Sequence, residues 1–131
     1  MNPVVEDLLS RAEYHLAEAE GVLREGYERL AGRESYQAMF HAAQAAIRAV
    51  APIVPKTHRG VISRFGQLCS GDTGLTSELG RRLSQAYSVK DAADYGSVAQ
   101  GKAIQASRMV ADAAEFVRRV RAFIATADPP A

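Results

Sequence analysis

Residues 35–44 read SYQAMFHAAQ and residues 56–67 read KTHRGVISRFGQ, and these two segments decide how the 131-residue chain folds. The first is rich in alanine and spaces its apolar residues as a helix does, so it predicts a helix that its neighbours can approach closely. The second contains Thr57, a favourable N-cap residue for another helix. Two of the three histidines, His41 and His58, lie in these segments. Their role, chemical or structural, therefore decides the functional interpretation.

The helix that contains the first segment is expected over residues 28–50. A wide apolar face predicts that this helix is central and packs on several neighbours. Pro52 and Pro55 then end it, because proline cannot continue a helix. Two adjacent stripes make up the apolar face: Tyr36, Phe40, Ala43 and Ile47 in one, and Met39, Ala42, Ala46 and Val50 in the other.

The same periodicity predicts four further helices, and hence an all-α fold. We expect a single up-and-down bundle of about five helices with a short third helix, spanning residues 1–126. Residues 127–131, with two prolines, are predicted to be a disordered tail. The four helices run from Pro3 to a break near Gly26, from Thr57 to Cys69, from a cap at Thr76 or Ser77 to an interruption at residues 91–96, and onward from about Ser97.

Composition and charge exclude several classes of function. The net charge is +1, from 16 basic and 15 acidic residues, which argues against broad binding to nucleic acid, although a local basic groove remains compatible with it. Cys69 is the only cysteine, so neither an intrachain disulfide nor a cysteine-based metal cluster is expected. The N-terminus does not resemble a signal peptide, and no apolar run approaches the ~18 residues of a membrane span. We predict a cytoplasmic protein without a metal or cofactor.

Five polar residues share one stripe of the central helix at steps of four, four, three and four: Arg33, Gln37, His41, Gln44 and Arg48. The simpler interpretation is a solvated helix face. The alternative is a surface that faces a dimer partner or a ligand, where amide and guanidinium groups meet bases or phosphates. His41 itself is interpreted as a hydrogen-bonded packing residue rather than as a catalyst.

The start of the third helix is a candidate anion or nucleotide site. Its first turn has free backbone N–H groups, which can hold a phosphate between Lys56 and Arg59, with His58 beside them. The alternative is that Thr57 and His58 cap and pack the helix start. A second candidate contributor is the segment with Asp94 and Tyr95, which offers a carboxylate and a phenol. The alternative interpretation is that this segment is a simple helix break.

Three blocks of the sequence resemble the HEPN domain family, whose name stands for higher eukaryotes and prokaryotes nucleotide-binding. They are residues 36–43 (YQAMFHAA), residues 56–67 and residues 93–96 (ADYG), and the middle block is the most specific. The match is to the stand-alone bacterial and archaeal branch. The resemblance implies a helical bundle that forms a homodimer. It also implies genomic association with minimal nucleotidyltransferases, often as toxin–antitoxin or defence pairs.

Catalytic relatives resemble metal-independent ribonucleases that carry an arginine, four to six residues, and then a histidine. Such cleavage needs a group that moves a proton and a cation that stabilises charge on the phosphate. This chain lacks the spacing, because the residues between each histidine and the arginine before it number three for His15, seven for His41 and nine for His58. Residues 90–96 (KDAADYG), where active relatives place the motif, contain neither residue type. We therefore predict no catalytic residue.

Two classes of function follow. The first is a non-catalytic, dimeric HEPN binding module of a toxin–antitoxin or defence system, partnering a minimal nucleotidyltransferase. The second is a ribonuclease toxin with a departed active site, built from His58, Arg59 and the Asp94–Tyr95 segment. A nucleotide-binding regulator is a third interpretation, although the net charge gives no support to nucleotide or RNA binding.

Overall fold

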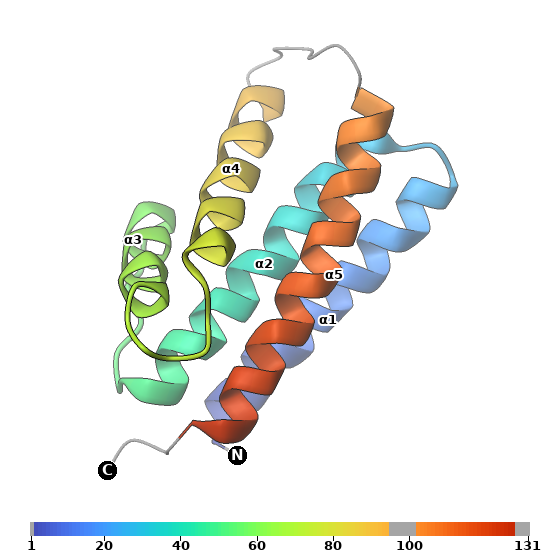
Figure 1. The fold of residues 1–131 in the computed structure, drawn as a ribbon. Coiled ribbons are helices and arrows are strands. Elements are labelled where there is room, and N and C mark those ends of the chain that lie inside the picture. Colours follow the sequence, from blue (N-terminus) through green and yellow to red (C-terminus); the bar gives the residue numbers. More distant parts are fainter. Residues whose placement is uncertain (1, 95–101, 128–131) are drawn as a thin grey trace.

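The computed structural model describes the backbone of residues 2–94 and 102–127, and the side chains of residues 2–91 and 105–127. This part of the chain forms five helices and no strand (Figure 1). The prediction of an all-α bundle of about five helices with a short third helix is confirmed. The helices are α1 (Pro3–Arg24), α2 (Glu28–Val50), α3 (His58–Cys69), α4 (Ser77–Asp94) and α5 (Lys102–Thr126).

Helix α2 is the centre of the bundle, as its wide apolar face predicts. It packs against all four other helices, most extensively against α1 and α5. Helices α1 and α5 lie on one side of α2, and the pair formed by α3 and α4 lies on the other (Figure 1). Helices α4 and α5 meet only slightly, so α2 joins the two halves of the molecule.

The predicted helix ends near the N-terminus and at α3 are confirmed. The side chain of Asn2 accepts a hydrogen bond from the backbone N–H of Val4 at 2.7 Å and caps α1. Gly26 lies between α1 and α2 with a φ of +88°, a conformation that L side chains rarely adopt. The hydroxyl of Thr57 accepts from the N–H of Gly60 at 2.9 Å, which caps α3.

The end of α4 differs from the prediction. The helix continues to Asp94, whereas an interruption was expected from Asp91. Ala92 and Ala93 favour helix, and this preference outweighs the local turn signal of the aspartates. The predicted start of the last helix near Ser97 lies outside the described residues, as do residues 128–131 of the predicted tail. The domain limits of 1–126 stay a prediction.

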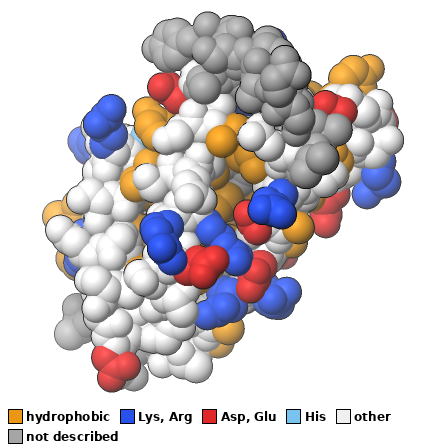
Figure 2. Space-filling view, turned by 45° about the horizontal axis from the view of Figure 1, so that its top comes forward, with side chains coloured by type: hydrophobic (Ala, Val, Ile, Leu, Met, Phe, Trp, Pro, Cys, Tyr) orange, Lys and Arg blue, Asp and Glu red, His pale blue; other side chains and the backbone are white. Residues whose placement is uncertain are grey.

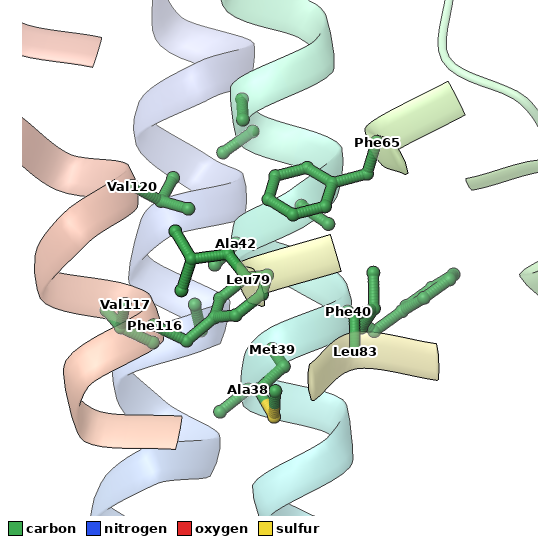
Figure 3. Packing of buried hydrophobic residues seen from close by; sticks show 14 of the residues in the cluster. Ala38, Met39, Phe40, Ala42, Phe65, Leu79, Leu83, Phe116, Val117 and Val120 are labelled. Carbon is green, nitrogen blue, oxygen red and sulfur yellow. The ribbon is translucent and has the colours of Figure 1, made fainter. Parts of the chain in front are cut away.

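The core is built where α3, α4 and α5 converge on α2 (Figure 3). Phe65 of α3 and Phe116 of α5 meet with ring centroids 5.1 Å apart. Ala38 and Ala42 of α2 are fully buried, so their small side chains let neighbouring helices come close. Cys69 is buried and acts as the small core residue that was expected. None of the described helices combines the length and the apolar character needed to cross a membrane.

Substituting Leu83 tests whether α4 is docked on the core. Leu83 is fully buried, so Leu83→Ala is expected to lower the free energy of unfolding by about 2–5 kcal/mol through lost burial and a cavity. Val89 lies on the same helix with 39% of its surface exposed, and Val89→Ala is the matched control. Urea denaturation measures both variants. Equal, small losses in the two would contradict the packing of α4.

Candidate functional site

The histidine at the start of α3 lies in a cluster of aromatic rings from three helices. The Nδ1 atom of His58 is 2.6 Å from the hydroxyl oxygen of Tyr36, a fully buried residue of α2. The His58 ring stacks on Phe40, with centroids 4.4 Å apart, and on Tyr87 of α4, at 5.7 Å. One imidazole therefore connects α3 with both α2 and α4.

The ionisation of the Tyr36–His58 pair follows from its burial. Burial raises the pKa of Tyr36 well above its ordinary value, and Tyr87 adds to that rise, so the phenol stays protonated. Burial also lowers the pKa of His58 from 6.5, and the charge of Lys90 lowers it further. A protonated phenol beside a neutral imidazole fits a hydrogen bond in which the Tyr36 O–H donates to Nδ1 of His58.

The other candidate anion-binding residues around the start of α3 remain at the surface. Lys56 and Arg59 are exposed, whereas the ring of His58 is engaged in the aromatic cluster and Thr57 caps the helix. Asp94 is the last residue of α4, and its side chain and Tyr95 lie outside the described residues. An anion or nucleotide site at this helix start stays a prediction.

The predicted polar stripe of α2 is more covered than a solvated face would be. Only Arg33 is exposed, and the other four stripe residues are half-buried. Nδ1 of His41 is 2.8 Å from Oε1 of Gln44, and Arg48 donates to the carbonyl of Ala51 at 3.4 Å. The His41 ring also stacks on His15 of α1, at 5.2 Å between centroids. The stripe thus takes part in helix packing along much of its length.

All three histidines of the chain belong to one continuous array of rings. His15 stacks on His41, the ring of Phe40 meets His41 edge-on at 5.7 Å between centroids, and Phe40 stacks on His58. Sequence reasoning did not find this array, because its contacts join residues of different helices. The partner of His15 is Glu34, 2.6 Å away across the α1–α2 packing, and no local spacing signals that pair.

A groove of about 480 Å³ lies between α4 and α5. Met39 of α2 and Met109 of α5 contribute apolar surface, and charged and polar side chains surround them. Figure 2 shows basic and acidic side chains mixed around hydrophobic ones on this face of the molecule. The remaining lining residues are Arg82, Ser84, Gln85, Ala86, Ser88 and Val89 of α4, and Gln105, Arg108 and Asp112 of α5.

An ion cluster ties α4 to α5 beside this groove. The guanidinium of Arg82 lies 2.8 Å from Glu115 and 3.8 Å from Asp112, both on α5, and 3.2 Å from Glu78 on its own helix. A hydrogen bond from Arg82 lowers the pKa of the Glu115 carboxyl. None of the groove residues was among the predicted site residues. The available signal was the set of polar residues at 105, 108 and 112 around Met109.

The described residues contain no group of three or more His, Cys, Asp and Glu side chains arranged to hold a metal ion. The polar atoms around the groove are guanidinium, amide, hydroxyl and carboxylate groups. Such a surface suits hydrogen bonds and ion pairs with another molecule.

These features define a class of protein: a small helical bundle with a histidine packed at the start of its third helix and a groove beside its last helix. The family described as "HEPN domain" matches residues 5–123. The chain therefore belongs to the HEPN domain family, and the resemblance seen in its sequence is confirmed.

Two similar proteins are both called UPF0332 protein. One, from Gloeobacter violaceus, is 32% identical over 126 residues, which cover 95% of this chain and 99% of that protein. The other, from Archaeoglobus fulgidus, is 33% identical over 95 residues, or 72% of this chain and 74% of the relative. The similarity thus extends over nearly the whole length of the first relative and most of the second.

The lowered pKa of His58 predicts acid-sensitive stability. The unfolded state binds a proton at His58 more tightly than the folded state does. The contribution of His58 to the free energy of unfolding is therefore fully present above pH 6.5 and is lost as the pH falls below that value. His58→Asn should weaken this loss, and Lys90→Gln should also weaken it by removing a like charge. Urea denaturation at pH 7.5 and 5.5 measures the change. A wild-type protein that becomes more stable in acid would contradict the assignment.

Proposed function

We propose that the chain is a non-catalytic HEPN protein that acts as a dimeric binding module in a toxin–antitoxin or defence system, with a minimal nucleotidyltransferase as its protein partner. The observation that supports this most directly is the environment of His58. Its Nδ1 atom is occupied by the buried hydroxyl of Tyr36, and its ring is stacked on Tyr36, Phe40 and Tyr87. A histidine held in this way fits a role in packing better than a role in proton transfer.

The other two histidines support the same proposal. His15 has its Nδ1 atom on Glu34, and His41 has its Nδ1 atom on Gln44 while its ring faces His15. Each imidazole has a structural partner. None follows an arginine with four to six residues between them, which is the spacing that the family resemblance implies for ribonuclease members. Binding therefore accounts for the described residues with fewer assumptions than catalysis does.

We propose that the dimer is built on the groove between α4 and α5. Stable interfaces generally bury more than about 1,000 Å² and place apolar side chains at their centre with a polar rim. The groove offers that pattern, because Met109 and the 39%-exposed Val89 lie among amide, hydroxyl and guanidinium groups. The weak contact between α4 and α5 leaves this surface open to a partner.

Light scattering tests the dimer. At tens of micromolar the wild-type protein is expected to have twice the mass of one chain, and Val89→Lys should shift it to monomer by burying a charge in the interface. Leu30→Lys is the matched control, because Leu30 has a similar exposure of 41% but lies at the start of α2, outside the groove. A monomeric wild-type protein would overturn the dimer.

Activity assays test the absence of catalysis. Purified protein is expected to leave tRNA and mRNA intact, and His58→Ala should change stability without changing that result. RNA cleavage that His58→Ala abolishes in a folded protein would establish the departed ribonuclease site instead. Thermal stabilisation by a nucleotide would support the regulator, by mass action on the folded state. Co-purification with a nucleotidyltransferase expressed alongside the chain tests the protein partner.

A further inference from the structure

The stacked pair formed by His15 and His41 lies between α1 and α2, the two helices with the most extensive contact in the molecule. Their ring centroids are 5.2 Å apart and the ring planes differ by 16°. Both residues are half-buried, and the side chain of His15 is 24% exposed. Two imidazole rings, each able to carry a proton, thus face one another in a packed helix interface.

The hydrogen bonds fix where each proton resides. Glu34 can only accept when it is ionised, so Nδ1 of His15 carries a hydrogen and donates it at 2.6 Å. Nδ1 of His41 likewise donates to the amide oxygen of Gln44 at 2.8 Å. In both rings Nε2 is therefore the atom that takes up the next proton.

The charges around the pair make its two sites unequal. Glu34 of α2 supplies a carboxylate to His15, whereas the hydrogen-bond partner of His41 is a neutral amide. Arg11 of α1 also acts on His41 as a like charge, opposed by Asp7, with which Arg11 pairs at 3.0 Å.

Among the described residues, the charged groups that act on His41 are those of His15, Arg11 and Asp7, all on α1. On the α3 side His41 meets the ring of Phe40, with His58 beyond it. From α5, Arg121 is 3.4 Å from Glu13 of α1 and so carries its own counter-charge. A single proton on the pair is thus compensated by Glu34, whereas a second proton on His41 meets only the carboxylate of Asp7, which already pairs with Arg11.

We propose that the His15–His41 stack is a pH-sensitive joint that holds α1 against α2 while it carries at most one proton, and that loosens α1 when it takes up a second. Two imidazolium rings face to face repel each other strongly in a partly desolvated interface. Burial, together with His15 and Arg11, lowers the pKa of His41 from 6.5, which agrees with this order of protonation. The inference concerns the α1–α2 interface and does not rest on the proposed function.

Amide hydrogen exchange tests the joint, expressed as protection factors at pH 7.5 and pH 5. Exchange from α5 reports opening of the whole molecule, so local loosening appears as a fall in protection on α1 that exceeds the fall on α5. In the wild-type protein that excess is expected to be on the order of tenfold, because two facing like charges repel in a half-buried site. In His41→Gln the excess should disappear, because only one imidazole remains to be charged.

Two further variants complete the test. Glu34→Gln removes the compensating carboxylate, so the loosening of α1 should begin at a higher pH than in the wild-type protein. His58→Gln is the matched histidine control and should leave the excess on α1 in place. If His41→Gln does not fold, His15→Gln is used with the same expectation. An excess that is absent from the wild-type protein, or that persists without one of the two stacked histidines, would overturn the proposal.

Discussion

The structure depends on the burial of α2 against four other helices at once. A central helix can satisfy four neighbours only if its side chains leave room for their backbones, and the fully buried alanines at positions 38, 42, 43, 45 and 46 provide that room. The larger side chains of α2, including Tyr36, Met39 and Ile47, then fill the spaces between the surrounding helices. Because every helix is placed by its contact with α2, the other pairwise contacts can be weaker, and between α4 and α5 they are.

This arrangement explains where the polar chemistry of the protein lies. Two polar groups of α2 lie where neighbouring helices pack on it, since His41 meets His15 of α1 and the hydroxyl of Tyr36 meets His58 of α3. The groove lies between α4 and α5, which meet only slightly, and Met39 of α2 lines it. Packing around one helix thus produces a histidine array where α1 and α3 meet α2, and an open polar surface between α4 and α5.

Much of the fold could be predicted from the sequence because it follows from local rules. The cap at Thr57, the break at Gly26 and the apolar face of residues 28–50 each depend on neighbouring positions along the chain. The candidate sites could not be predicted as well, because their decisive contacts join distant residues. Tyr36 and His58 are separated by 22 positions, and Arg82 and Glu115 by 33, and no periodicity relates the members of either pair. The extension of α4 to Asp94 shows the converse, since two local signals disagreed there and helix propensity prevailed.

The slight contact between α4 and α5 has a mechanical consequence. Helices α3 and α4 are attached to the rest of the molecule mainly through α2, through the contact of Phe65 with Phe116 and through the guanidinium of Arg82. Parts of a protein with few contacts to the remainder open first, as cooperative units. Because α3 and α4 have few contacts with helices other than α2, these two helices are expected to open together as one unit.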